Sequence, residues 1–171
     1  VPGLAESWEI SEGGLVYTFH LRPAAKWSNG DPIIAGDVVE SFRRMLTPAL
    51  ASEYAYLVYN FVVGAKDYYE GRITDFSQVG FNAPDDHTFQ VTLINATPYL
   101  LKIMASHYSW WPVPVKVVTQ FGELGQKRTQ WTRAGNLVGN GPFKLKEWSP
   151  NRRVIVERNP YYWDAKTVKL D

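Results

Sequence analysis

Cysteine is absent from the sequence, so the chain can form neither a disulfide bond nor a metal site built on thiolates. Long runs of lysine or arginine are also absent, and the formal net charge is only +1, which argues against a nucleic-acid surface or an electrostatic membrane anchor. No stretch approaches the roughly 18 apolar residues of a transmembrane helix. The 171 residues are enough to bury a core, and 15% of them are aromatic, which suits both packing and recognition surfaces.

The motifs of common catalytic and metal sites are missing as well. The three histidines, His20, His87 and His107, stand at no spacing typical of metal ligands. His20 falls on the polar face of a predicted strand and His87 in a turn, where we expect solvated side chains. Asp85–Asp86 follows a proline and is typical of a turn rather than of an acid–base pair. Phosphate-loop and G-x-S-x-G motifs do not occur, so the sequence predicts no catalytic residue, metal site or cofactor.

Alternation of apolar and polar residues predicts three β-hairpins. Their paired segments are 8–11 with 15–22, 79–83 with 88–93, and 143–148 with 153–158. Turn-forming residues separate the two segments in each case. The hairpins therefore account for most of the extended structure that we expect.

Apolar residues at helical spacing predict a helix over 37–46, with Asp37 in its first turn and Glu40 within reach of Arg44. Three shorter helices are predicted, over 65–71, from a Thr97 N-cap and Pro98 to about Ala105, and around 115–121. Residues 122–141 have the polar, glycine-bearing composition of a loop. Hairpins and short helices without βαβ periodicity predict an α+β fold.

Residues 106–114, SHYSWWPVP, concentrate a histidine, three aromatic side chains and two prolines. The prolines favour extended backbone, and an extended aromatic segment after a helix can either pack in the core or line a groove. The residues alone leave both alternatives open. The tryptophans that stand beside strand and turn signals are expected to be packing anchors: Trp8, Trp27, Trp148 and Trp163.

Several motifs, in the same order along the chain, resemble the extracytoplasmic oligopeptide-binding proteins of ABC transporters, which form solute-binding protein family 5. These motifs are Leu4–Trp8, Tyr17–Arg22, Lys26–Pro32, Asp85–Leu93, Pro112–Pro114, Gly139–Leu145 and Val156–Asp164. The chain departs from the family pattern at Ile34–Gly36, where Thr or Ser often precedes the helix. Ser106–Trp111 is also longer than the family form by one residue, which affects the alignment of His107.

The resemblance implies a fragment of a periplasmic-binding-protein type II-like fold, made mainly of antiparallel hairpins with short helices. Members of the family have two lobes that close around the ligand by a hinge motion. On this reading, residues 1–27 belong to the first lobe, 28–138 form the extra domain of peptide-binding members, and 139–171 return into the first lobe. The second lobe would be absent from the chain.

The resemblance also implies ligand contacts. A family tyrosine in an Ala-Ser-x-Tyr-Ala stretch corresponds to Tyr54, and a family histidine after a Pro-Tyr helix corresponds to His107. Local chemistry adds Tyr108 and Trp110, because amphipathic rings suit the walls of roomy, wet pockets. Trp111 and its neighbouring prolines are expected to pack instead.

The implied function is the capture of oligopeptides outside the cytoplasmic membrane, without catalysis, for delivery to the permease subunits of an ABC importer. An extended peptide can be held through its backbone and its charged ends. The expected location is periplasmic, or extracellular and membrane-anchored, with membrane contact only through the transporter or a lipid anchor. The residues leave open another solute, such as a dipeptide, an oligosaccharide or a chelated metal. A hydrolase and a stand-alone interaction domain are less favoured.

Overall fold

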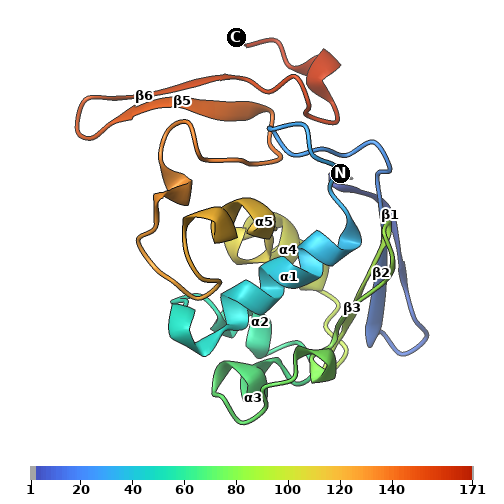
Figure 1. Cartoon of the computed structure of the whole chain (residues 1–171). Helices are drawn as coiled ribbons and strands as arrows, with labels where there is room; N and C mark the ends of the chain where they lie inside the picture. The colour runs from blue at the N-terminus through green and yellow to red at the C-terminus, as the bar shows by residue number, and fades with distance from the viewer. Residues whose placement is uncertain (1–2, 171) are drawn as a thin grey trace.

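The computed structural model describes residues 3–170 and contains two antiparallel sheets and a group of short helices (Figure 1). The strands are β1 (Ala5–Ile10), β2 (Val16–Leu21), β3 (Phe81–Asp85), β4 (Thr88–Thr92), β5 (Phe143–Ser149) and β6 (Arg153–Arg158). The α-helices are α1 (Ala35–Leu46), α2 (Tyr56–Tyr59), α3 (Ala65–Tyr69), α4 (Leu100–Ser106) and α5 (Val115–Val118). This combination confirms the predicted α+β class. Within the described range, no helix is long and apolar enough to cross a membrane.

The two N-terminal hairpins join into one four-stranded sheet of order β1-β2-β4-β3. Strand β2 lies inside this sheet and pairs with β1 on one side and with β4 on the other. Its side chains alternate between buried and half-buried, as the sequence predicts. Phe19 stands opposite Phe89 of β4, with ring centroids 6.1 Å apart. The pairing of β2 with β4 therefore turns two separate hairpins into one apolar face.

Helix α1 packs on this face of the sheet. Its buried residues recur at helical spacing and are Ala35, Asp37, Val38, Ser41, Phe42 and Leu46. The Phe42 ring stacks on Phe81 with centroids 4.3 Å apart and lies 5.9 Å from Phe89. Trp110 approaches the same ring edge-on at 5.5 Å. Aromatic contacts thus join the sheet, α1 and the SHYSWWPVP segment in one hydrophobic core.

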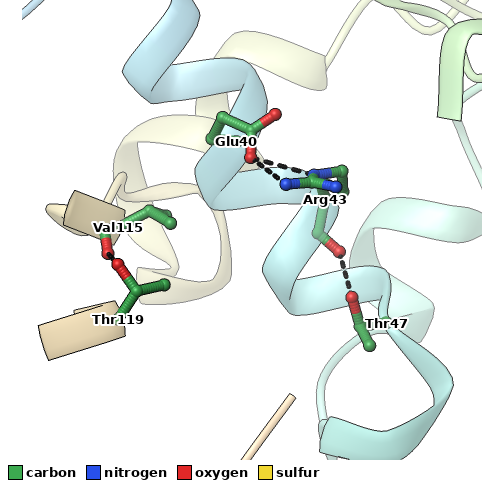
Figure 2. A network of polar contacts seen from close by, with 5 residues as sticks. All are labelled: Glu40, Arg43, Thr47, Val115 and Thr119. Carbon is green, nitrogen blue, oxygen red and sulfur yellow. Dashed lines mark hydrogen bonds and ion pairs between the residues drawn. The ribbon is translucent and has the colours of Figure 1, made fainter. Parts of the chain in front are cut away.

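One ion pair on the polar face of α1 differs from the sequence prediction. Glu40 binds Arg43 rather than Arg44, with the Arg43 Nε atom 2.9 Å from Glu40 Oε2 (Figure 2). The Arg44 guanidinium instead lies 5.6 Å from the centre of the Trp131 ring. At the end of α1, the Thr47 hydroxyl donates to the Arg43 carbonyl at 2.8 Å, and this bond satisfies a terminal carbonyl of the helix.

Both predicted helix starts differ in detail from the structure. Helix α1 begins without a side-chain N-cap at Ile34, whose backbone N–H is 3.4 Å from the Asp37 carboxylate. Helix α4 begins at Leu100, later than the predicted Pro98. Thr97 does not cap it, because its hydroxyl donates to the Asn95 carbonyl at 3.0 Å. Residues 97–99 form the turn that precedes this helix.

The third hairpin, β5–β6, is confirmed and forms a two-stranded sheet of its own, apart from the four-stranded sheet (Figure 1). Strand β2, from the 1–27 segment, shares a sheet and a core with elements from the 28–138 segment. The expected division into 1–27, 28–138 and 139–171 stays a prediction. Residues 1, 2 and 171 of the expected outer segments lie outside the described range.

A joint of polar contacts around Asn159 attaches the β5–β6 hairpin to the rest of the chain. The Asn159 side chain is fully buried and donates to the Gly141 carbonyl at 2.8 Å, while its oxygen accepts the Tyr161 N–H at 3.0 Å. The Ser28 N–H donates to the Gly139 carbonyl at 2.8 Å, which links the joint to the turn after β2. The 139–141 stretch therefore has a structural role in holding this joint.

The four tryptophans expected to be packing anchors have different environments. Trp27 is buried with Ala25 and Ile33 in a small second core, as predicted. Trp148 is 59% exposed on β5, so that expectation is wrong for this tryptophan. Trp8 and Trp163 also keep more than a third of their surface exposed. Trp163 packs through its ring face, 4.0 Å from the Arg22 guanidinium, which is a cation–π contact.

Truncation of Phe42 tests the aromatic centre of the core. We expect Phe42→Ala to lower the free energy of unfolding by about 3–5 kcal/mol, because the cavity removes contacts to the sheet and to Trp110 at once. Ile94→Ala, at a half-exposed position after β4, is the control and should cost no more than about 0.5 kcal/mol. Urea denaturation of both variants gives the comparison, and equal losses would contradict this view of the core.

Truncation of Asn159 tests the joint. Asn159→Ala leaves the Gly141 carbonyl and the Tyr161 N–H without their partner, so we expect a loss of about 1–3 kcal/mol. Hydrogen exchange should accelerate at the Tyr161 amide and in β5–β6 more than in the four-stranded sheet. Asn60→Ala, at an exposed asparagine, serves as the control. Unchanged exchange at Tyr161 in the Asn159 variant would show that the joint does not depend on this side chain.

Candidate functional site

Three of the four predicted ligand contacts meet on one surface. The Tyr54 ring lies 5.1 Å from the His107 ring and 5.4 Å from the Tyr108 ring, measured between centroids. His107 and Tyr108 stack on each other at 4.5 Å. Tyr54 is 37% exposed and Tyr108 is 57% exposed, so both side chains are partly accessible to solvent. Residues more than fifty positions apart in the sequence therefore form one exposed aromatic cluster.

The orientation of the His107 ring is fixed by the turn that follows it. Helix α4 ends at Ser106, and Tyr108–Trp110 then form a single 3₁₀ turn that His107 caps. The His107 Nδ1 atom accepts the Ser109 N–H at 3.2 Å and lies 2.9 Å from the Ser109 hydroxyl oxygen. Because Nδ1 acts as the acceptor, the neutral ring carries its proton on Nε2. Within the described residues this Nε2 group has no hydrogen-bond partner, so it is free to donate to a ligand.

Trp110 joins the two segments that carry the cluster. Its indole N–H donates to the Leu57 carbonyl of α2 at 3.1 Å, and its ring packs against Phe42 in the core. Only 4% of its surface is exposed. Tyr54 lies just before α2, and its carbonyl accepts the Leu57 N–H at 3.1 Å. The buried tryptophan thus holds the Tyr54 loop against the His107–Tyr108 turn.

Tyr108 shows a pKa above its ordinary value. Partial removal of its phenol from water is the largest cause, followed by hydrogen bonding to Tyr54 and by the neighbouring Tyr54 and Glu53 charges. Tyr108 therefore stays neutral and keeps its hydroxyl as both donor and acceptor at physiological pH. The cluster offers hydrogen-bonding groups and ring faces without a charge on the phenol.

A groove of about 730 Å³ lies between the four-stranded sheet, α1, α4 and the joint. Its lining is mainly apolar and includes Leu21, Met104, Trp110, Trp111, Pro142 and Trp163, but not the rings of the cluster. Trp111 is 57% exposed here, so the expectation that it packs is wrong. Both alternatives for SHYSWWPVP are therefore realised, since Trp110 is in the core and Trp111 lines the groove. Contact of Trp110 with a ligand stays a prediction.

Two residues near the cluster were missed from the sequence. The Tyr56 ring lies 6.2 Å from Tyr54 and is 42% exposed, and Glu53 lies close enough to affect the Tyr108 phenol. Both residues flank Tyr54 in the Glu-Tyr-Ala-Tyr run, and this closeness in sequence is the signal that could have identified them. The periodicity of residues 54–70 did not separate inward from outward side chains, because α2 has only four residues. The expected surface positions of His20 and His87 agree with the structure, in which neither is buried.

The described residues at this surface show no arrangement typical of catalysis or metal binding. In the part of the chain that the structure describes, no group of three or more histidine or acidic side chains is arranged to hold a metal ion. His107 contacts Ser109 and tyrosines, and the cluster contains no carboxylate that orients the ring. The geometry is that of a contact surface with aromatic faces, hydroxyl groups and one imidazole N–H.

The chain also matches a known protein family. The family described as "Bacterial extracellular solute-binding proteins, family 5 Middle" matches residues 1–171. The chain belongs to this family. The resemblance seen in the motifs is therefore confirmed over the whole chain, and the family is described as one of solute-binding proteins.

Curated relatives include the "Periplasmic oligopeptide-binding protein OppA" of Escherichia coli (strain K12), which is 46% identical over 171 residues. The alignment covers 98% of this chain and 30% of that protein. The "Probable deoxycholate-binding periplasmic protein YgiS" of the same organism is 36% identical, with 99% of this chain and 30% of that protein covered. The chain thus spans about 30% of the length of the curated relatives it matches.

Solved structures confirm the fold. A periplasmic oligopeptide-binding protein, OppAIV, from Borrelia burgdorferi matches with a TM-score of 0.91 at 37% identity, over 99% of this chain and 32% of that one. Haemophilus influenzae OppA in complex with RPPGFSPFR matches with a TM-score of 0.88 at 41% identity, over 97% and 31%. The chain therefore has the fold of part of a periplasmic oligopeptide-binding protein.

The neighbouring tryptophans give a direct test of which ring belongs to the core. We expect Trp110→Ala to lower the free energy of unfolding by about 3–5 kcal/mol, because it removes core volume and leaves the Leu57 carbonyl without its donor. Trp111→Ala is the matched control and should change stability by no more than about 1 kcal/mol. Thermal or urea denaturation distinguishes the two variants. A larger loss for Trp111 would contradict the placement of these side chains.

Proposed function

We propose that this chain is part of a receptor that captures oligopeptides outside the cytoplasmic membrane and delivers them to an ABC importer. The observation that carries the proposal is the meeting of Tyr54, His107 and Tyr108 on one exposed surface of a chain from this family. The two positions with family counterparts, Tyr54 and His107, stand next to each other there. The cluster would form one wall of the ligand site.

The chemistry of this wall suits peptides of varied sequence. Tyrosine and histidine rings offer apolar faces together with polar edges and have few rotamers to freeze on binding. The free Nε2–H of His107 and the hydroxyl groups of Tyr54 and Tyr108 can bind waters that adapt to different side chains. A peptide backbone and its charged ends would be held by other parts of the receptor.

The proposed receptor has two lobes, and this chain would contribute the described sheet, the helices and the β5–β6 hairpin. Residues from about 139 onward would return toward the first lobe, as the joint at Asn159 suggests. Periplasmic or extracellular residence and docking to permease subunits follow from the same proposal, since the relative in Escherichia coli is described as periplasmic. The second lobe would close over the aromatic cluster.

A second candidate is a receptor of the same family for another solute. The relative described as probably deoxycholate-binding gives this candidate a specific observation. The 730 Å³ apolar groove is large enough for a compact apolar molecule, and its lining includes Trp111 and Met104. On this alternative the ligand would contact Trp111 and Trp163 rather than Tyr54 and His107.

Native mass spectrometry of the complete receptor that contains this chain, purified without refolding, tests the function. We expect a series of co-purified peptide masses, because a receptor with adaptable pockets retains a mixture of ligands. Tyr54→Ala and His107→Ala should each weaken binding of a tripeptide such as tri-alanine about tenfold or less, since each removes one wall contact. Trp148→Ala, on the distant hairpin, is the control. One non-peptide mass would favour the second candidate instead.

A further inference from the structure

Residues 125–131, which we call the strap, lie against the turn that follows α1. The strap backbone at Gly125 comes so close to this turn that an added Cβ atom would stand 3.0 Å from Ala49 Cβ and 3.1 Å from Thr47 Cγ2. Real Cβ atoms rarely make contacts this short, so a residue larger than glycine would displace the strap or the turn. The strap is therefore packed on the residues that lead from α1 toward Tyr54.

The last residue of this turn, Ala51, has an uncommon backbone conformation. Its φ and ψ angles are 42° and 56°, in the left-handed region that residues with a Cβ atom seldom adopt. Such a conformation persists only where surrounding contacts impose it. The Lys127 ammonium group of the strap donates to the Ala51 carbonyl at 3.2 Å and is one such contact. Tyr54 follows closely in sequence, so the direction in which the chain leaves Ala51 affects where the Tyr54 ring lies.

The other end of the strap meets a half-buried arginine of α1. The Arg44 guanidinium lies 5.6 Å from the centre of the Trp131 ring, within the range of a cation–π contact. Among the residues that the structure describes, Arg44 forms no ion pair, and its buried Nε atom has no hydrogen-bond partner. Burial also lowers the pKa of Arg44, as expected for a cation partly removed from water. The Trp131 ring face attracts this cation, so loss of the ring should loosen the strap.

We propose that the strap positions the loop 51–55, and that Gly125 and Lys127 are positioning residues that act on a ligand through Tyr54. The part of this proposal that concerns binding rests on the proposed function. Gly125 and Lys127 contact the turn and not the aromatic rings. A change in the strap therefore alters the wall of the site without removing any group that a ligand would meet.

Fluorine NMR of the complete receptor labelled with 3-fluorotyrosine tests the positioning without a ligand. The Tyr54 resonance is assigned by its loss in Tyr54→Phe. We expect Gly125→Ala and Lys127→Met each to move or split this resonance, because both loosen the turn that precedes the loop. Lys127→Arg, which keeps a donor, should restore the original position. Trp131→Leu, which removes the ring face from Arg44, should also move the resonance.

Two matched substitutions control for the loss of a glycine and of a lysine. At Gly36, an added Cβ atom would have only an ordinary contact of 3.8 Å, so Gly36→Ala should leave the Tyr54 resonance in place. Lys66 is exposed on α3, and Lys66→Met should also have no effect. The resonance of Tyr161, at the joint, should stay unchanged in the strap variants.

Isothermal titration with tri-alanine gives the second readout. We expect Gly125→Ala and Lys127→Met each to weaken binding about threefold, the size of effect typical of residues that act on a site without touching its ligand. Lys127→Arg and the two controls should bind as the unaltered receptor does. Urea denaturation of the same variants measures any loss of stability separately.

The outcomes separate this proposal from the proposed function. A lower urea midpoint with an unmoved Tyr54 resonance and an unchanged dissociation constant would show a purely structural strap and overturn the positioning role. A moved resonance with unchanged affinity would overturn the role in binding, while the peptide receptor stands. If tri-alanine and other peptides fail to bind even the unaltered receptor, the proposed function falls. The Tyr54 resonance of the free receptor then decides the positioning alone, and an unmoved resonance overturns it.

Discussion

The pairing of β2 with β4 is the contact on which the rest of the structure depends. It joins residues 16–20 to 88–92 in antiparallel register and brings Phe19 opposite Phe89. Helix α1 packs Phe42 on Phe81 and Phe89 of the β3–β4 hairpin, and β2 extends this apolar face through Phe19. Phe42 in turn provides the surface against which Trp110 packs. The pairing is long-range, so its loop-closure entropy must be offset by the burial that it makes possible.

The candidate site depends on this core through one side chain. Trp110 has its ring in the core and its N–H on the Leu57 carbonyl, so the position of α2 follows the position of the sheet. Tyr54 precedes α2 and His107 precedes the Trp110 turn, which explains why two segments distant in sequence present their rings together. A binding surface made of short turns needs such support, because a single turn cannot hold a side chain in place by itself.

Local patterns were enough to predict the hairpins and most helices, since period-2 and period-3.6 alternation reports which face of an element is buried. They did not predict that β2 pairs with β4, because alternation says nothing about which strands are neighbours. The prediction that Thr97 caps α4 was wrong for a related reason. The Thr97 hydroxyl donates to the Asn95 carbonyl instead, and only the folded turn brings these two groups together. At the site, family motifs indicated Tyr54 and His107. The positions of Glu53 and Tyr56 beside the cluster were not predicted, because they follow from the path of the loop that leads into α2.

The contrast between Trp110 and Trp111 shows how a short segment can place one ring in the core and leave the next one exposed. A 3₁₀ turn over Tyr108–Trp110 advances side chains by about a third of a turn per residue, so neighbours point in different directions. Ser109 and Trp110 face the core, while Tyr108 on one side and Trp111 on the other face solvent. The prolines then end the turn and prevent a helix from continuing. If these rings contact a ligand as proposed, their fixed positions would lose little freedom on binding, which would offset the hydrophobic area left uncovered in the free chain.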